Sequence, residues 1–274
     1  MGNNAFQLGV FIKSVVPIKL HPSFESEMAD EGLYGMVVKV IEDTGDGWYY
    51  IETHYDYSGY AHQSDMFMDE KRSLDWKNSA TNVITHSIVD VMAAPTYKSY
   101  IIEVLTRGGV VALTGEEKDG WSEIELIDKK RGWVRSTFVE SLKTEANRLD
   151  EEKLRKSLVA TALSYIGTQY RWGGRSAFGI DCSGLCSISY LLNGIIIYRD
   201  AELKSQYMRK ISLDEIKPAD LLFFPGHVAM YIGDDKYVHS SSSINGVAIN
   251  SLNPKDYDYR EDLAKEITGI GTIF

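Results

Sequence analysis

The sequence predicts a multidomain protein in which two copies of a small β-domain precede an α+β domain. Three observations lead to this fold class. An internal repeat at an offset of 73 residues fills the first half of the 274-residue chain, each copy carries short β-rich runs, and a helical pattern followed by further strands begins near residue 144. We therefore expect domains at residues 1–72, 73–143 and 144–274.

The repeat aligns without gaps. Its clearest element is Asp46-Gly47-Trp48, which recurs as Asp119-Gly120-Trp121. Further pairs 73 residues apart are Ser14 and Ser87, Val16 and Val89, Pro22 and Pro95, Gly35 and Gly108, and Gly59 and Gly132. A repeat of this length without helical periodicity indicates two copies of one β-domain.

Each copy reads as short strands. In the first copy residues 34–40 are β-rich, Asp46-Gly47 is a hairpin turn signal, residues 48–52 alternate, and Gly59-Tyr60 opens a short closing strand. This rhythm resembles the bacterial SH3-like barrel (SH3b).

The third segment has a different pattern. Residues 144–166 read as an amphipathic helix with Leu154, Leu158 and Ala162 on one face, and Gly167 is a natural stop. Strands are expected at residues 220–224, 227–232, 236–240, 247–252 and 271–274. A helix followed by an antiparallel meander is an α+β domain.

Composition narrows the class of partner. The formal net charge of −10 argues against nucleic acid or an anionic membrane as a partner. The first ten residues lack the features of a signal peptide, and no apolar run approaches the roughly 18 residues of a membrane span. The two cysteines, four residues apart, do not suggest a disulfide framework. We expect a cytoplasmic monomer that binds neither nucleic acid nor membrane and needs no cofactor.

Cys182 is the candidate nucleophile. Asp181 is a good N-cap for a helix that begins at Cys182, and the positive end of such a helix favours a thiolate. Asp181 raises the thiol pKa by its charge, so the lowering is expected from a neighbouring imidazolium. The alternative is that Cys182 is a buried small apolar residue, which is the expectation for Cys186.

Two histidines supply the other groups that a thiol nucleophile needs, a base and a residue that orients it. His227 and His239 lie on adjacent predicted strands joined around residues 233–235. A three-residue loop would place them on one face of the hairpin, and a two-residue turn would place them on opposite faces. Zinc ligation together with Cys182 is the alternative, although the sequence offers no obvious further ligands.

Two further segments fit a binding pocket. Tyr170-Arg171-Trp172-Gly173-Gly174 combines aromatic residues with glycines that let backbone approach a ligand, and its alternative is a turn with core aromatics. Arg199-Asp200 offers charges in a loop, which an idle surface ion pair would also explain.

From about residue 150 to 274 the chain resembles the NlpC/P60 cysteine peptidases, which have a papain-like fold. The segments that carry the resemblance are residues 170–174, 181–184, 199–200 with Gln206, 218–223, 226–233 and His239. Ala219 and Ala229 stand where this family usually has Gly, and Ala201 stands where it usually has Ser. With the two SH3b copies, the chain resembles γ-D-glutamyl-L-diamino acid endopeptidases that recycle murein peptides.

The resemblance implies a role for each matching residue. Cys182 would attack the carbonyl between D-Glu and the diamino acid, His227 would be the base and then the acid, and His239 would orient His227. Asp181 would face the free α-amine of L-Ala. The other implied substrate contacts are Tyr170, Trp172, Ser183, Arg199 and Asp200, with Glu27, Tyr57 and Tyr60 from the first SH3b copy.

Alternatives remain. A secreted hydrolase could use the SH3b copies to bind intact cell wall. A wall-binding or sensor module with an inert peptidase domain is a different class, which the complete Cys182, His227 and His239 set argues against. Related acyltransferases and amidases share the Cys/His core and lack the SH3b pair.

Overall fold

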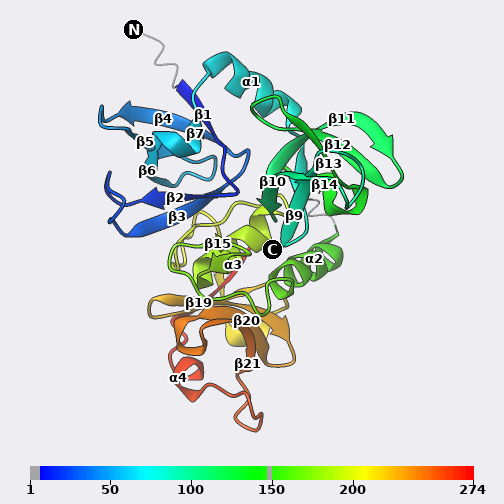
Figure 1. The fold of residues 1–274 in the computed structure, drawn as a ribbon. Coiled ribbons are helices and arrows are strands. Elements are labelled where there is room, and N and C mark those ends of the chain that lie inside the picture. The colour runs from blue at the N-terminus through cyan, green and yellow to red at the C-terminus, as the bar shows by residue number, and fades with distance from the viewer. Residues whose placement is uncertain (1–6, 147–149) are drawn as a thin grey trace. The chain divides into compact units, whose positions relative to one another are not determined.

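The structure, a computed structural model, describes residues 7–146 and 150–274. Its chain forms two compact units, Met1–Leu142 and Lys143–Phe274. In Figure 1 the first runs from blue to green and the second from green to red. No helix in the described ranges is long and apolar enough to cross a membrane.

The N-terminal unit contains two sheets with the same strand order. The first copy holds β1 Gln7–Phe11, β2 Val15–Lys19, β3 Met28–Leu33, β4 Val37–Asp43, β5 Trp48–Glu52, β6 Ser58–His62 and β7 Met66–Phe67. The second holds β8 Asn82–Ile84, β9 Ile88–Met92, β10 Ile101–Thr106, β11 Val110–Lys118, β12 Trp121–Glu125, β13 Arg131–Arg135 and β14 Val139–Ser141. The orders are β3-β2-β6-β5-β4-β1-β7 and β10-β9-β13-β12-β11-β8-β14, so each strand has its counterpart in the other copy. The prediction of two copies of one SH3-like β-domain is confirmed.

The Asp-Gly turn signal has different outcomes in the two copies. In the second copy Asp119 and Gly120, with φ of 51° and 75°, form a two-residue turn between β11 and β12. In the first copy β4 ends at Asp43, and four residues lead to β5, including Gly45 and Gly47 at positive φ. The first hairpin is present with a longer loop than the motif alone predicts.

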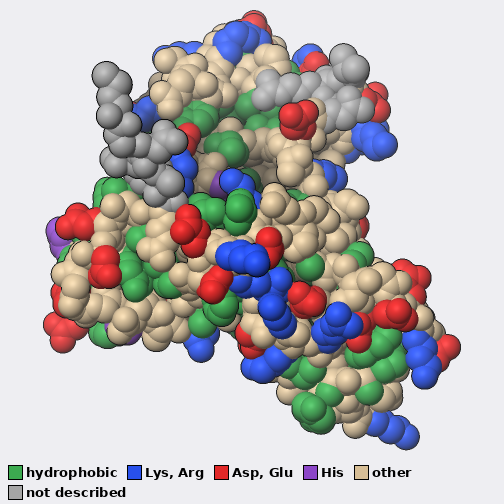
Figure 2. Space-filling model, turned by 90° about the horizontal axis from the view of Figure 1, so that it is seen from above, with side chains coloured by type: hydrophobic (Ala, Val, Ile, Leu, Met, Phe, Trp, Pro, Cys, Tyr) green, Lys and Arg blue, Asp and Glu red, His purple; other side chains and the backbone are tan. Residues whose placement is uncertain are grey.

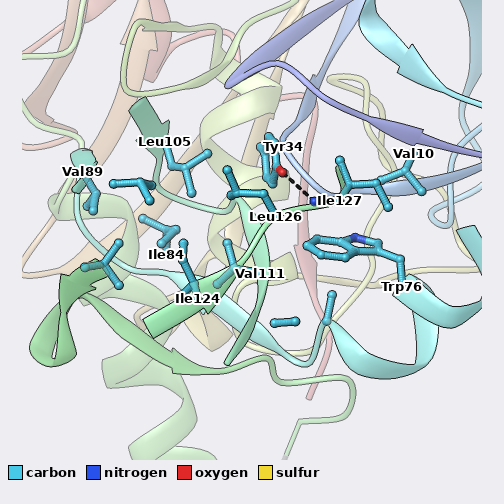
Figure 3. Close-up of a cluster of buried hydrophobic side chains, with 14 residues drawn as sticks. Val10, Tyr34, Trp76, Ile84, Val89, Leu105, Val111, Ile124, Leu126 and Ile127 are labelled. Atoms are coloured by element: carbon cyan, nitrogen blue, oxygen red, sulfur yellow. Dashed lines mark hydrogen bonds between the residues drawn. The ribbon is translucent and has the colours of Figure 1, made fainter. Parts of the chain in front are cut away.

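A helix that the sequence pattern did not predict, α1 Glu70–Ser79, joins the copies. Leu74 and Trp76 are its only large apolar residues, so it shows no amphipathic pattern. Trp76 is fully buried in a cluster that draws on both copies, including Val10, Ile84 and Val111, as Figure 3 shows. The Trp76 indole N–H donates to Gly35 O at 2.9 Å, and the Ile127 N–H donates to the Tyr34 hydroxyl at 2.9 Å. The two copies therefore share one core.

The C-terminal unit is an α+β domain. Its helices are α2 Glu151–Leu163, α3 Cys182–Leu191 and α4 Glu261–Ala264. A small hairpin, β15 Arg175–Ser176 and β16 Gly179–Ile180, precedes α3. The main sheet contains β17 Arg209–Ile211, β18 Leu221–Phe224, β19 His227–Gly233, β20 Lys236–Ser241, β21 Gly246–Ser251 and β22 Gly269–Thr272, in the order β17-β22-β18-β19-β20-β21. Short 3₁₀ turns within the described ranges are Gln63–Asp65, Ser136–Phe138, Leu213–Glu215 and Ser242–Ile244.

Two expectations for this unit need correction. The predicted helix at 144–166 begins only at Glu151, because the Asp150 side chain caps it by accepting the Lys153 N–H at 3.1 Å, and it ends at Leu163. Residues 147–149 of that prediction lie outside the described ranges. The sheet is also more than a meander, since the last strand, β22, lies between β17 and β18.

Helix α3 packs against β19 and β20, and this contact carries Cys182 to the sheet. Leu185 and Ile188 of α3 are fully buried. Ile180 lies two residues before α3, and its carbonyl accepts a hydrogen bond from the hydroxyl of the fully buried Ser240 at 2.7 Å. The N-terminus of α3 is thus held to the sheet both by apolar packing and by a side-chain hydrogen bond.

Charged side chains are spread over the surface. Despite the net charge of −10, acidic and basic side chains intermingle on the face that Figure 2 shows. That face offers no single large acidic patch.

Candidate active site

Cys182 is the first residue of α3, as the N-cap pattern predicts. The Asp181 carboxylate accepts the Gly184 N–H at 2.5 Å and so caps the helix. Cys182 is 7% exposed, and the backbone N–H groups of Val228 and Ser183 hydrogen-bond to its sulfur. Since Val228 follows His227 directly, this bond brings the start of β19 to the sulfur.

The resting thiol is neutral. Burial raises the pKa of Cys182 to about 11, and the negative charge of Asp181 adds to the shift. The two N–H bonds and Arg199 lower it only partly. Burial thus acts against the expected resting thiolate beside an imidazolium, because its effect on the thiol pKa outweighs that of the helix N-terminus. Cys186 is buried and its thiol pKa is raised by burial, consistent with a core residue.

His227 and His239 face each other across the β19–β20 hairpin. Nε2 of His227 and Nδ1 of His239 lie 2.8 Å apart. The turn itself is Asp234-Asp235, both at positive φ, and so has two residues where three were expected. A register shift between Tyr231 and Gly233 restores the alignment, because one extra residue in a bulge reverses the effect of the shorter turn. The two rings therefore share a face of the hairpin because of this bulge and not because of the length of the loop.

The proton positions follow from the partners. His239 Nε2 lies 2.9 Å from Oδ1 of Asn250, an oxygen that can only accept, so this nitrogen carries the proton. His239 Nδ1 is then an acceptor, and His227 donates to it from Nε2. Nδ1 of His227 is left as the free basic nitrogen.

Both imidazoles are neutral at rest. Burial, followed by the charge that His239 would carry, lowers the pKa of His227 to about 3. Burial lowers the pKa of His239 to about 4, and its bond to Asn250 opposes that shift. Because the thiol and the imidazoles are neutral at rest, the proton of the thiol is expected to move to an imidazole during the attack on the substrate and not before it.

Asp181 sits in a second network. Both of its carboxylate oxygens accept from the Arg199 guanidinium, at 3.1 Å each. One oxygen also accepts the Gly173 N–H at 2.8 Å, and the Ser183 hydroxyl is 3.3 Å from the other. Arg199 is 2% exposed and donates further to Ser183 Oγ and Gly173 O, at 2.8 and 3.0 Å.

This network adds a structural role to two predicted substrate contacts. Asp181 is paired with Arg199, and its predicted contact with the amine of a substrate would be made beside that ion pair. These bonds of Arg199 tie it to the Cys182 helix and to the loop at Gly173, which is the geometry of a structural clamp. Ser183, 8% exposed, belongs to the same network.

The aromatic residues before α3 lie at the site. Burial raises the pKa of Tyr170 to about 12, and the nearby Cys182 contributes to the shift. Its hydroxyl is therefore a neutral hydrogen-bond donor near the sulfur. Trp172 is 60% exposed, which leaves its ring free to contact a ligand.

A small pocket lies beside α3 and the loop that follows it. Asp200 and Ser183 line it together with Cys186 and Val228, and the loop after α3 supplies Tyr198, Glu202, Lys204 and Tyr207. Lys204 forms an ion pair with Glu202 at 2.7 Å, and its ammonium lies over the Tyr198 ring. The lining of this pocket thus contains both carboxylate and ammonium groups.

Glu27, Tyr57 and Tyr60 lie in the N-terminal unit, where Glu27 precedes β3, Tyr57 precedes β6 and Tyr60 is part of β6. Glu27 is exposed just before β3, and its carbonyl accepts the Leu20 N–H at 3.0 Å. Tyr60 of β6 pairs with Lys19 of β2, and the Tyr57 hydroxyl is 3.5 Å from Ala29 O. All three residues therefore lie at or next to β3 and β6, the two strands that flank β2.

Asn250 is the residue that sequence reasoning missed. His239 pairs with Ala248 in the β20–β21 ladder, so Asn250 is its diagonal neighbour two positions along. The available signal was a polar Asn, next to Ser251, in a strand expected to pair with that of His239.

The comparisons with known proteins agree with this geometry. Residues 167–264 match the NlpC/P60 family, residues 21–66 the bacterial dipeptidyl-peptidase Sh3 domain, and residues 86–140 the bacterial SH3 domain. Dipeptidyl-peptidase 6 of Lysinibacillus sphaericus is 39% identical over 269 residues, covering 97% of this chain and 99% of that protein. A gamma-D-glutamyl-L-lysine dipeptidyl-peptidase of Bacillus subtilis (strain 168) is 31% identical over 148 residues, 49% of this chain and 50% of the relative.

The fold is also found among solved structures. The crystal structure of an NlpC/P60 family protein from Bacillus cereus ATCC 10987 superposes with a TM-score of 0.78 at 20% identity, covering 97% of this chain and 99% of that one. With a relative aligned along nearly its whole length and the family match spanning Cys182, His227 and His239, the chain belongs to the NlpC/P60 peptidases and carries two bacterial SH3 domains.

Proposed function

We propose that this peptidase hydrolyses the γ-D-glutamyl–L-diamino acid bond of murein peptides with a free N-terminal L-Ala, in cell-wall peptide recycling. The observation that carries the chemistry is the directed bond from His227 to His239 beside the buried Cys182. The substrate class is supported by the relatives named dipeptidyl-peptidase 6 and gamma-D-glutamyl-L-lysine dipeptidyl-peptidase.

In the proposed reaction His227 Nδ1 takes the thiol proton as Cys182 Sγ attacks the γ-carbonyl carbon of D-Glu. Backbone N–H at the start of α3 and the Tyr170 hydroxyl stabilise the oxyanion. The C–N bond then breaks as the imidazolium gives its proton to the leaving amine. Water, deprotonated by His227, attacks the thioester and releases the dipeptide and the free thiol.

Recognition is assigned to the residues around Cys182 and the loop after α3. We assign the wall of the site to Trp172 and the D-Glu side of the substrate to Ser183 and Asp200. Asp181 and Arg199 hold this wall in shape through their mutual bonds, and the Asp181 carboxylate remains the predicted partner of the free α-amine of L-Ala. Glu27, Tyr57 and Tyr60 remain predicted substrate contacts, and single Ala variants test them through KM.

Mass spectrometry of products from synthetic L-Ala-γ-D-Glu-diamino acid tripeptides tests the proposal. We expect release of L-Ala-γ-D-Glu from the free tripeptide and about 10- to 100-fold slower cleavage after N-acetylation, since a lost charged hydrogen bond costs about 1.5–3 kcal/mol. Parallel substrates with meso-diaminopimelate and L-lysine show which diamino acid is preferred. No cleavage of either free tripeptide would overturn the proposal.

A second candidate is a secreted hydrolase whose SH3 copies bind intact cell wall. The two SH3 matches favour this possibility. Equal rates on free and N-acetylated peptides, with digestion of purified sacculi, would support it. Cell fractionation separates the two, because the recycling role predicts the cytoplasm.

A further inference from the structure

A histidine does not orient another histidine by itself. A neutral imidazole has two tautomers, so His239 can present Nδ1 to His227 either as an acceptor or as an N–H donor. Only the first leaves Nδ1 of His227 unprotonated. Some other group must therefore select the tautomer of His239.

We propose that Asn250 is a positioning residue that holds His239 as the Nε2–H tautomer and thereby keeps Nδ1 of His227 free to take the Cys182 proton. The kinetic part of this inference rests on the proposed function. The tautomer itself can be measured without any substrate.

The direction of the Asn250 amide is fixed by a backbone carbonyl. Nδ2 of Asn250 donates to Asp258 O at 2.8 Å, and a carbonyl oxygen can only accept. The same carbonyl also accepts the Ser251 N–H at 3.1 Å. Oδ1 of Asn250 must therefore be the atom that faces His239, at 2.9 Å.

Asp258 is itself held in place. Its carboxylate accepts from Lys236 Nζ at 2.8 and 3.2 Å, and Lys236 also pairs with Asp256 at 2.8 Å. Lys236 begins β20, the strand that carries His239. The Asp258 carbonyl, which aligns Asn250, is thus anchored through Lys236 to β20. The same strand carries His239, the imidazole that Asn250 aligns.

The wrong tautomer would be costly at this position. His239 is 0% exposed, so an Nε2 without a proton would face Oδ1 with no donor between them. The charged groups that act on the two imidazoles, Arg260 and Asp262, are paired with each other at 2.5 Å. The effects of Arg260 and Asp262 on the imidazoles oppose each other. The neutral Asn250 is therefore the group that sets the direction of the hydrogen bonds from His227 to His239 and from His239 to Asn250.

Nitrogen-15 NMR of histidine-labelled protein tests the tautomers directly. In the wild type we expect both His227 and His239 as Nε2–H forms, assigned with His227→Gln and His239→Gln. In Asn250→Leu the His239 signals should move toward a mixture of tautomers. Asn253→Ala is the matched control, because the Asn253 side chain accepts only the nearby Lys255 N–H. An unchanged Nε2–H form in a folded Asn250→Leu protein would overturn the inference.

Kinetics give a second readout. Asn250→Leu should lower kcat about 10- to 100-fold, the usual range for a group that orients a ligating or catalytic histidine, with little change in KM. Asn253→Ala should have wild-type kinetics. A rise in KM with an unchanged kcat would show a structural role and contradict the inference.

Asn250→Asp keeps the acceptor, loses the donor to Asp258 and still yields an answer where Asn250→Leu fails to fold. The carboxylate preserves the Nε2–H tautomer but favours a doubly protonated His239. A doubly protonated His239 forces the proton of His227 onto Nδ1, which then cannot act as a base. The acid limb of the kcat/KM profile should therefore move up by at least about one pH unit. An unshifted limb would contradict the inference.

Discussion

Two hydrogen-bond networks meet at Cys182, and they differ in what fixes them. The imidazole relay of His227, His239 and Asn250 joins neutral groups, each through one directed bond. The carboxylate clamp of Asp181, Arg199, Ser183 and Gly173 joins a buried ion pair through several bonds at once. Reversing one hydrogen bond disables the imidazole relay. The carboxylate clamp keeps its shape until Asp181 or Arg199 loses its charge.

The difference separates chemistry from architecture. The relay determines which nitrogen can accept the thiol proton, so its changes should appear in kcat. The clamp fixes the start of α3 and the loop at Gly173, so its changes should appear first in the free energy of unfolding. The following predictions test this separation.

The largest effect is expected in the relay at His227. His227→Ala should lower kcat by about 10³- to 10⁴-fold, because the base and acid are lost. His239→Ala should be milder, at about 10²-fold, since orientation is lost and the base remains. Steady-state kinetics with circular dichroism as a fold control checks both. A larger loss in His239→Ala would require the two roles to be exchanged.

The clamp should respond in stability. Arg199→Met leaves the buried Asp181 carboxylate without its cation and should lower the free energy of unfolding by about 3–5 kcal/mol. Urea denaturation measures the change. Arg209→Met is the matched control, because Arg209 is exposed and its ion pair with Glu215 is 4.0 Å long. Equal stability of the two variants would show that the clamp is not structural.

Acid should weaken the relay. The folded pKa values of His227 and His239, about 3 and about 4, lie below the usual 6.5. Between those values the unfolded chain binds more protons, so this stability is present above pH 6.5 and is lost as pH falls. The wild type should lose up to about 1.4 kcal/mol per pH unit for each imidazole. A His227→Gln/His239→Gln variant should lose less between pH 6.5 and 4, and parallel curves would contradict the prediction.

A small gain is expected outside both networks. Ala219 adopts φ of 76°, a left-handed conformation that an L residue with a Cβ disfavours. Its N–H donates to Tyr231 O at 2.8 Å, so the conformation is held by β19. Ala219→Gly should stabilise the fold by about 0.5–1 kcal/mol after the entropy of glycine is counted, with unchanged kcat. A destabilised variant would show that the Ala219 methyl packs usefully.

Local sequence patterns predicted the helices and strands better than they predicted the long-range contacts between them. The repeat and the N-cap at Asp181 are visible in the sequence because each depends on neighbouring residues. Helix α1 was missed because its stability comes from Trp76 in a core shared by both SH3 copies. The bulge that aligns the histidines and the pairing of Arg199 with Asp181 depend on long-range contacts, which spacing alone does not encode.

Asn250 shows the same limit. Its function depends on the Asp258 carbonyl, which the chain reaches only after a turn beyond β21. A strand pattern could place Asn250 near His239 but could not orient its amide. The direction of the relay is therefore a property of the fold.

Trapping the acyl-enzyme tests the proposed chemistry most directly. Rapid acid quench of the protein with L-Ala-γ-D-Glu-diamino acid, followed by intact and peptide mass spectrometry, should show L-Ala-γ-D-Glu as a thioester on Cys182. Cys182→Ala should fold, lack the adduct and be inactive, whereas Cys186→Ala should retain the adduct. An active Cys182→Ala protein, or an adduct on Cys186, would contradict Cys182 as the nucleophile.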